Sequence, residues 1–472
     1  MGTTDVQAGN VTRPGARPGR GRRIGWVAAA VAAVLALVGG LVSVFLMITG
    51  NMPGDSMDSA WETPADSAAA EHGNGSWLVG DVLVRSRFDE VTGYGVRTGK
   101  QHWEYVLPGR SEICSTSTPE DSVLLLVHGE NVTAAEADGE GCAGITALDL
   151  KTGKELWSGS RKASAKATAG VAAGTIGGPV NGTVAAGGGL AVVLDTWTDG
   201  LGEVVADGRK AIRAVDLRTG ERRWTATVPK DCRPFDVGAA KRRVVAVLSC
   251  GKENRSELTA AVFDPATGSL LHNEPLDARR PVASFSSSSA VRTALLSIDP
   301  LVVSVRPAYD TEPGTDAFFS FGADGRRQSR IEISGEHGKI VADKPSKVAI
   351  DGEHLYAVAD FGKSSTSSRV VAIDLTTGRL AWEADSGRGD TVALAVHDGK
   401  VTVLHQDRGS FTETLYVLDG ATGEELDDRN FSVDIDRDDG WLAGLFDRDG
   451  LLIVSRYDTD GPGRPFAAYE RW

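Results

Sequence analysis

Short apolar runs separated by turn residues follow one another through most of the chain. Val123–Val127, Val244–Leu248 and Leu451–Val454 are examples. Runs of this length, rich in Val, Ile and Leu, are typical of buried β-strands, because buried helices need about ten or more residues. The 57 glycines and 4 methionines of the 472-residue chain also favour many tight turns over long helices. The pattern predicts an all-β protein.

One sequence motif recurs along the chain and organises these runs. Its best copies, Ile145–Trp157, Ile212–Trp224 and Val370–Trp382, share the order Ala-x-Asp-x-x-Thr-Gly-x-x-x-Trp, and weaker copies occupy 95–103, 259–268, 318–325 and 415–423. Each copy predicts a β-hairpin whose Asp carboxylate accepts hydrogen bonds from turn N–H groups and whose Gly supplies a positive φ. The turn glycines are Gly99, Gly153, Gly220, Gly268, Gly378 and Gly423, with Gly325 in the most eroded copy.

A tryptophan follows the turn glycine by four residues in four of the copies, at Trp103, Trp157, Trp224 and Trp382. A large flat side chain at one fixed strand position predicts packing against the neighbouring repeat rather than ligand binding. Ser59–Thr63 resembles Leu380–Ala384, the outermost strand of the sixth repeat. Trp61 is therefore expected to take the same place in a last repeat and to close the structure.

The spacing of the repeats predicts the architecture. The turn glycines, Gly325 included, lie between 45 and 67 residues apart, a period that fits four strands per repeat. The longest interval contains Gly159–Gly189, a segment rich in Ala, Gly, Ser and Thr that we expect to be a mobile insertion. Four-stranded repeats describe the blades of a β-propeller, which protects its sheet edges by radial closure. Residues 58–472 give about 52 residues for each of eight blades, and seven blades with a free N-terminal tail is the alternative.

The repeat motif resembles that of pyrroloquinoline-quinone (PQQ)-type propellers, and the resemblance covers nearly all of the chain after residue 58. That family includes quinone-dependent alcohol and glucose dehydrogenases, a non-catalytic lipoprotein of outer-membrane protein assembly, and sensor domains of bacterial membrane kinases. The dehydrogenases carry a disulfide between adjacent cysteines over the cofactor, whereas the cysteines here are separated by 28, 90 and 18 positions. Their calcium ligands and catalytic Asp have no match either. The resemblance therefore implies a non-enzymatic member without a cofactor.

An uncharged apolar segment, Ile24–Thr49, precedes the repeats. With a rise of about 1.5 Å per residue, a helix of this length crosses a hydrocarbon core of about 30 Å. Five arginines lie just before the segment and no Lys or Arg follows until Arg85, so the positive-inside rule places the N-terminus in the cytoplasm. We expect a basic cytoplasmic tail at 1–23, a single-pass signal anchor at 24–49, a linker at 50–57 and a propeller outside the cytoplasm at 58–472. A buried core helix is the alternative, but such helices usually have a polar face.

Charge and cysteine content support an exported domain. After the apolar segment, 45 basic and 63 acidic residues leave a net charge of −18, which disfavours nucleic acid as a partner. Cys114, Cys142, Cys232 and Cys250 all lie in the same part, an even number that predicts two disulfides in an oxidising compartment. The expected strand positions pair Cys114 with Cys142 and Cys232 with Cys250.

Candidate chemistry is sparse. The sequence has no G-x-S-x-G, H-E-x-x-H, Walker or kinase motif, and its eight histidines are dispersed. Asp434–Gly440 has the alternating acidic residues of a calcium loop, but the Gly and Glu that an EF-hand requires are replaced by Asp439 and Leu445. A solvated acidic loop is therefore the alternative. No catalytic, cofactor or metal residue is assigned.

The sequence favours a non-catalytic binding or assembly scaffold in the cell envelope, held in the cell membrane and bound to another envelope protein. A sensor that binds a small ligand in the central funnel is the second hypothesis, and a quinone-dependent dehydrogenase is the third. Partners are expected on the rim opposite the Thr-Gly turns, because the loops between second and third strands lie there. Those loops are at 129–142, 195–211, 306–317, 360–369 and 405–414.

Overall fold

The computed structural model divides the chain into two compact parts, Met1–Gly54 and Asp55–Trp472. The structure describes residues 21–48, 56–65, 75–109, 111–130, 144–160, 184–195, 211–251, 256–280, 292–307, 314–342, 345–361, 368–385, 390–406, 413–431, 441–448, 450–457 and 464–471.

The first part contains one helix, α1, which extends from Gly21 to Ile48 and covers most of the apolar segment. Side chains are described for residues 31–44 of this helix, and all of them are exposed. Among the described residues, no helix combines the length and the apolar character that crossing a membrane requires. The predicted transmembrane anchor therefore stays a prediction.

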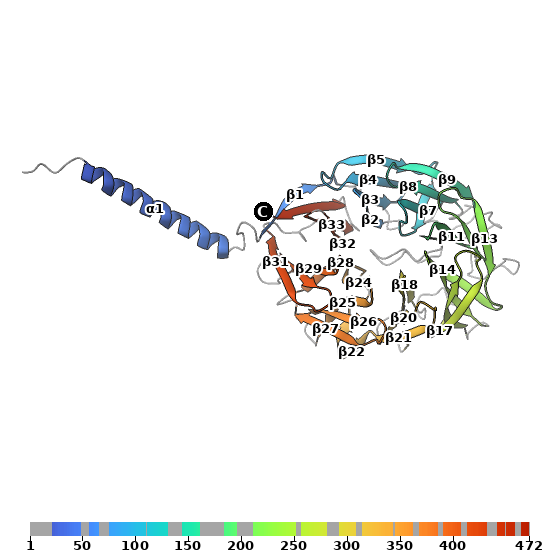
Figure 1. Ribbon diagram of the computed structural model, residues 1–472. Coiled ribbons are helices and arrows are strands. Elements are labelled where there is room, and N and C mark those ends of the chain that lie inside the picture. The colour runs from blue at the N-terminus through green and yellow to red at the C-terminus, as the bar shows by residue number, and fades with distance from the viewer. Residues whose placement is uncertain are drawn as a thin grey trace, which may run out of the picture. The chain divides into compact units, whose positions relative to one another are not determined.

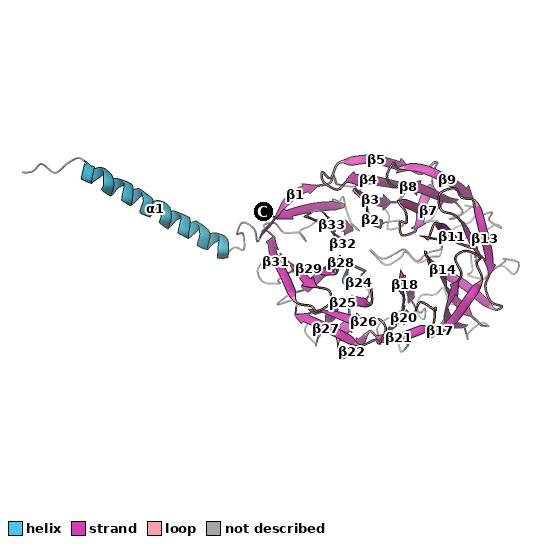
Figure 2. Ribbon diagram, viewed as in Figure 1, coloured by secondary structure: helices cyan, strands magenta, loops and turns pink. Residues whose placement is uncertain are grey.

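The second part is an all-β ring of radially arranged sheets, shown in Figures 1 and 2. Its described strands form seven sheets, five of four strands, one of six and one of eight. We number the repeats by their strands. Repeat 1 contains β2 (Gly75–Val79), β3 (Val82–Arg87), β4 (Glu90–Gly95) and β5 (Gln101–Val106), and repeat 2 contains β6 (Ser111–Thr116), β7 (Val123–Glu130), β8 (Gly144–Asp149) and β9 (Lys154–Ser160). Repeat 3 contains β10 (Val184–Gly187), β11 (Leu190–Asp195), β12 (Ala211–Asp216) and β13 (Arg222–Thr227). Repeat 4 contains β14 (Cys232–Ala240), β15 (Arg243–Cys250), β16 (Ser256–Phe263) and β17 (Leu270–Arg280).

The later repeats follow the same plan with two departures, in repeats 6 and 8. Repeat 5 contains β18 (Arg292–Ile298), β19 (Leu301–Arg306), β20 (Ala317–Phe321) and β21 (Arg327–Glu332). Repeat 6 contains β22 (Ser334–Gly335), β23 (Gly338–Ile340), β24 (Val348–Asp351), β25 (His354–Asp360), β26 (Ser368–Asp374) and β27 (Leu380–Asp385). Repeat 7 contains β28 (Asp390–His397), β29 (Lys400–Gln406), β30 (Glu413–Asp419) and β31 (Glu425–Phe431), and repeat 8 contains β32 (Trp441–Arg448), β33 (Leu451–Tyr457) and β34 (Phe466–Arg471).

Repeat 8 takes its outermost strand from the start of the second part. β1 (Ser56–Glu62) pairs antiparallel with β34, from Met57 opposite Arg471 to Glu62 opposite Ala467. It also pairs in parallel with the end of β31, which joins repeats 7 and 8 into the eight-stranded sheet. The expectation that the N-terminal segment completes the last repeat agrees with this pairing.

The hydrophobic core is divided into layers that lie between consecutive repeats. One layer packs Trp224 of repeat 3 against Phe263 of repeat 4. Another brings Phe466 of repeat 8 against Tyr94 of repeat 1, with ring centroids 5.8 Å apart in an edge-to-face arrangement. Because the last repeat packs against the first, the ring is closed and its sheets have few free edges.

The inner strand of repeat 6 is interrupted. β23 and β24 both pair with β25, and the short 3₁₀ helix η1 (Pro345–Lys347) lies between them in sequence. η1 contacts β28 and β32, the first strands of repeats 7 and 8. Figure 1 shows β28 and β32 on the inner side of repeats 7 and 8, so η1 lies on the inner side of the ring.

The disulfide between Cys232 and Cys250 forms as predicted, at the point where β14 and β15 pair these two residues directly. Cys114, at the inner strand of repeat 2, is also disulfide-bonded. Cys142, its predicted partner, lies outside the described residues, so this pairing stays a prediction.

Candidate functional site

The Thr-Gly turns of the repeats share one hydrogen-bond pattern. In repeat 2, Asp149 Oδ1 accepts hydrogen bonds from the backbone N of Lys151 and of Thr152, at 3.1 and 3.0 Å, and from Thr152 Oγ1 at 2.9 Å. Gly153 closes the turn with a φ of +68°, and its N–H donates to the Asp149 carbonyl at 2.8 Å. The motif Asp and Thr are therefore occupied in holding the turn, which leaves them little capacity for ligand chemistry.

Hydrogen bonds of the same kind lower the pKa values of three other motif aspartates, Asp216, Asp264 and Asp419. The pKa of Asp216 falls to about 2, chiefly because Arg223 donates to its carboxylate and then because Thr219 N–H does. The pKa values of Asp264 and Asp419 are lowered in the same direction, each chiefly by the hydroxyl of the turn threonine. The carboxylates of these turns stay ionised well below neutral pH, as acceptors must.

Each predicted repeat tryptophan lies on the turn glycine of the following repeat. A Cβ placed on Gly153 would meet Trp103 at 2.6 Å, and one placed on Gly268 would meet Trp224 at 2.5 Å. The same contact joins Trp157 to Gly220, Trp382 to Gly423 and Trp61 to Gly99. Glycine is required at these positions both for the positive φ and because a side chain would enter the volume of the indole.

Hydrogen bonds from the indole N–H groups hold three of these tryptophans, Trp157, Trp224 and Trp382, in their positions. Trp224 Nε1 donates to the Pro265 carbonyl at 2.7 Å, and Trp382 Nε1 donates to the Gly420 carbonyl at 2.9 Å. Both acceptors belong to the following repeat. These tryptophans therefore connect consecutive repeats rather than line a ligand site.

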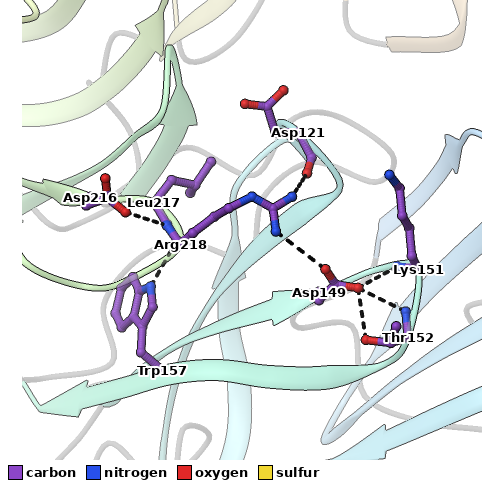
Figure 3. A network of polar contacts seen from close by, with 8 residues as sticks. All are labelled: Asp121, Asp149, Lys151, Thr152, Trp157, Asp216, Leu217 and Arg218. Carbon is purple, nitrogen blue, oxygen red and sulfur yellow. Dashed lines mark hydrogen bonds and ion pairs between the residues drawn. The ribbon is translucent and has the colours of Figure 1, made fainter.

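An arginine strengthens one of these contacts, between repeats 2 and 3 (Figure 3). Arg218 donates from Nη2 to the Asp121 carbonyl at 2.6 Å, and its Nη1 lies 3.6 Å from Asp149 Oδ2. Trp157 Nε1 donates to the carbonyl of Leu217, the residue before Arg218, at 2.9 Å. One turn of repeat 3 is thus held both by the indole and by the turn aspartate of repeat 2.

Repeats 4 and 5 lack the tryptophan. His272 takes its place in repeat 4, with its Cδ2 3.1 Å from the Cβ position of Gly325. Ser329 takes its place in repeat 5, where its hydroxyl donates to the Leu375 carbonyl of repeat 6 at 2.8 Å. Neither residue matches the repeat motif, so no sequence signal marked them as contacts between repeats.

Ion pairs replace the indole contact between repeats 4 and 5. Arg242 donates from Nε and Nη2 to the two carboxylate oxygens of Asp299, at 2.7 and 2.5 Å. Arg243, which is buried, donates to the Gly322 carbonyl at 2.9 Å. Burial lowers the pKa of Arg243, and the Asp299 carboxylate opposes that shift. This interface adds ion pairs to its apolar layer, where the interface of repeats 3 and 4 has the Trp224 indole.

Repeat 7 also lacks the tryptophan, for a structural reason. In the described part of repeat 8, the third strand β34 is not joined to its fourth strand by a Thr-Gly turn, because the fourth strand is β1 from the start of the ring. Asp427 stands at the tryptophan position and forms ion pairs with Arg429 at 2.7 Å and with Arg471 at 3.5 Å. An acidic residue that pairs with the C-terminal strand thus replaces an aromatic residue that would have no glycine to cover.

Buried basic side chains end several second strands, at the rim opposite the Thr-Gly turns. They are Arg85 and Arg87 in repeat 1, Arg306 in repeat 5, His405 in repeat 7 and Arg456 in repeat 8. Sequence reasoning missed them, although an apolar run that ends in Arg recurs in these strands. They lie at the base of the connections between second and third strands, where partner binding was expected.

Two of these arginines each have a polar contact within their own repeat. Arg306 Nε donates to Asp316 Oδ1 at 3.1 Å, across the connection from β19 to β20. Arg456 Nη2 donates to the hydroxyl of Tyr469 at 3.2 Å, and burial raises the pKa of that tyrosine. These contacts fix the bases of the rim loops, which suits a rigid platform that presents loops to a partner.

The loops themselves lie mostly outside the described residues. The same holds for the predicted calcium stretch Asp434–Gly440 and for the central part of the insertion Gly159–Gly189. Within the described ranges, no group of three or more His, Cys, Asp or Glu side chains could hold a metal ion. The calcium hypothesis therefore stays a prediction.

Comparison with known proteins assigns this chain to a protein family. The model of the family described as outer membrane protein assembly factor BamB matches residues 58–233 and 319–426, more than half of the chain. No curated protein sequence matches the chain.

Similar solved structures include BamB from Moraxella catarrhalis, which is 14% identical with a TM-score of 0.44 and covers 87% of this chain and 99% of its own. The computationally designed Ika8 protein is 15% identical with a TM-score of 0.46, covering 89% of this chain and 100% of its own. Quinohemoprotein alcohol dehydrogenase from Comamonas testosteroni is 14% identical with a TM-score of 0.47, covering 88% and 76%. On the strength of the family match, this chain, whose repeats are of the PQQ type, belongs to the family of the outer membrane protein assembly factor BamB.

Proposed function

We propose that this chain is a membrane-anchored propeller outside the cytoplasm that serves as a non-catalytic scaffold for another envelope protein. Membership of the BamB family, whose name describes an assembly factor, is the observation that carries this proposal. The motif residues support it, because their polar groups are used in turns and repeat contacts rather than gathered in a reactive site. The anchor is inferred from the uncharged segment Ile24–Thr49 and the five arginines before it.

The proposal includes eight blades. The eight-stranded sheet consists of two sets of four, β28 to β31 and β32 to β34 with β1, which meet only at the short parallel pairing of β1 and β31. Repeat 6 has six strands because its inner strand is divided into β23 and β24 and because the short strand β22 pairs with β23. Within the described part of the ring, eight core layers between consecutive repeats support the same number.

The register of β1 supports an orientation on the membrane. In repeat 2, Asp149 pairs with Lys154 just after the turn, and in repeat 8 Glu470 pairs with Asp58 at the same place. Ser56 and Met57 therefore stand where a Thr-Gly turn would be, and the chain enters the ring on that face. The seven residues from 49 to 55 can extend over about 25 Å at most. The Thr-Gly face is thus the one turned to the bilayer, and the opposite rim is free for a partner.

Crosslinking in intact cells followed by affinity purification tests the scaffold role. A stable protein partner that disappears when residues 407–412, between β29 and β30, are replaced by a short Gly-Ser connection supports the proposal. The matched control replaces Lys151 and Thr152, on the other face, by Ser and should leave the partner bound. Absence of any partner, together with thermal stabilisation by an envelope metabolite, would support a sensor instead.

Cysteine labelling on cells stripped of their wall tests the orientation. Single cysteines at Asp199 and Thr311 should react quickly with a bulky impermeant reagent, because in sequence they follow the second strands β11 and β19, which end at the rim opposite the Thr-Gly turns. Cysteines at Lys151 and Thr376, on the Thr-Gly face, should react slowly. The reverse order would place the other face outward.

A further inference from the structure

The strand β1 contacts three repeats, although it belongs by sequence to none of them. Its backbone pairs with β34 of repeat 8, and at its start with Asn430 and Phe431 of repeat 7. Near its end, Trp61 lies over Gly99 of repeat 1. One short strand thus connects the last two repeats and the first.

The side chains of β1 and of the residue after it make specific contacts with the repeats around them. Met57 is fully buried in the core layer that contains Phe431 and Tyr469. Just after β1, Thr63 Oγ1 donates to the Phe466 carbonyl at 3.0 Å and accepts from the Phe466 N–H at 3.0 Å. Glu62 forms an ion pair with Arg464. Apolar, hydrogen-bonding and charged groups all recognise this one segment.

The chain segments on either side of β1 do not connect it to repeat 8, with which it pairs. Its partner strand β34 lies about 400 residues away, since Thr63 and Phe466 are separated by 403 positions. In sequence, β1 connects to repeat 1 through residues 63–74 and to α1 through residues 49–55. The strand is therefore held in repeat 8 by non-covalent contacts alone.

We propose that the edge of β34 opposite β33, together with the end of β31 and the Gly99 turn, is a strand-binding site whose ligand is β1, and that these non-covalent contacts alone can hold the ring on its N-terminal segment. The ring then stays attached after the chain is cut between β1 and repeat 1. It is released when a competing extended segment pairs with β34 in place of β1, as in β-strand addition. The role of this contact in membrane retention rests on the proposed anchor, but the binding itself does not.

A cleavable full-length chain tests the binding. A protease recognition sequence is placed between Ala65 and Gly75, and an affinity tag at the N-terminus. After cleavage in detergent, the ring should co-purify with the tagged N-terminal fragment. An excess of a synthetic peptide with the sequence of Ser56–Thr63 should then release it, whereas the same peptide with Ala in place of Trp should not.

Substitutions in β1 make the test quantitative. Trp61→Ala should raise the rate of release about tenfold or more, because it empties the space over Gly99. Ser59→Ala, at an exposed position of the same strand, is the matched control and should leave the rate unchanged. If Trp61→Ala does not fold, Thr63→Val removes the hydroxyl contacts to Phe466 and should also accelerate release.

The outcomes separate the two proposals. Loss of the ring on cleavage without competing peptide, or equal release rates for Trp61→Ala and Ser59→Ala, would overturn the strand-binding site. Sedimentation of the uncut chain with membranes tests the anchor independently. A chain that binds its tagged fragment but does not sediment would keep the site and reject the anchor.

Discussion

The contact between Trp382 and Gly423 can be tested by a double-mutant cycle in the ring-forming part, Asp55–Trp472. Trp382 is 8% exposed, and replacing it by Ala should cost about 3 to 5 kcal/mol of unfolding free energy. About 1 kcal/mol of this is the indole hydrogen bond to the Gly420 carbonyl. That carbonyl also accepts from the Tyr356 hydroxyl at 3.0 Å, so the substitution does not leave it unpaired.

The glycine carries two costs that the cycle can separate. Gly423 has a φ of +74°, and Ala in that conformation costs about 1 to 2 kcal/mol. Its new Cβ would also lie 2.5 Å from Trp382 Cε3, and moving the indole should add about 1 to 3 kcal/mol. In the Trp382→Ala background the second cost disappears. Gly423→Ala should therefore be less harmful there by about 1 to 3 kcal/mol.

Gly352 is the matched control. Its φ is +56°, and nothing lies within 4 Å of its Cβ position. Gly352→Ala should cost only the backbone contribution and should add to Trp382→Ala without coupling. Urea denaturation at unchanged slope gives the free energies for all five variants. Equal losses of unfolding free energy for Gly423→Ala and Gly352→Ala, or additive losses in both cycles, would refute the contact between Trp382 and Gly423.

Other contacts of the ring can be tested in simpler ways. Trp61→Ala should cost about 3 kcal/mol or more in the same assay, and an unchanged midpoint would mean that β1 does not close the ring. Burial lowers the pKa of His128, so the folded state binds fewer protons than the unfolded state and stability falls as pH drops below about 6.5. Urea midpoints at pH 7 and pH 5 should therefore differ less for His128→Gln than for the wild type, and equal differences would exclude His128 as the cause. Non-reducing peptide mapping should find Cys114 linked to Cys142, and any other partner would reject that pairing. Calorimetric titration tests Asp434–Gly440, where absence of calcium binding tighter than about millimolar would end the calcium hypothesis.

The repeat motif predicted the turns and the tryptophan contacts because both are local in sequence. Asp, Thr and Gly of one turn lie within five residues, and the tryptophan follows the glycine at a fixed distance. Trp61 could be placed by the same rule, since its neighbours Ala60 and Glu62 repeat those of Trp382. A pattern that recurs with its physical cause can be extended to a copy that lies far from the others.

Contacts that depend on the relative positions of repeats could not be predicted in this way. His272 and Ser329 take the place of the tryptophan without any shared residue type, and ion pairs such as Arg242 to Asp299 join side chains 57 positions apart. The parallel pairing of β1 with β31 and the direction of η1 also depend on how neighbouring strands approach. The buried arginines of the rim were hidden for another reason, because charged residues at strand ends are usually exposed.

The pairing of β1 with β34 imposes an order on folding. β1 is synthesised before every other strand of the ring, but its partner is complete only when the last residues appear, about 400 positions later. At about 5 to 20 residues per second, this delay is about 20 to 80 s. Repeats 1 to 7 can fold as they emerge, while β1 keeps an apolar residue and unpaired backbone groups exposed. Completion of the ring therefore depends on keeping this single strand available until β34 has been synthesised.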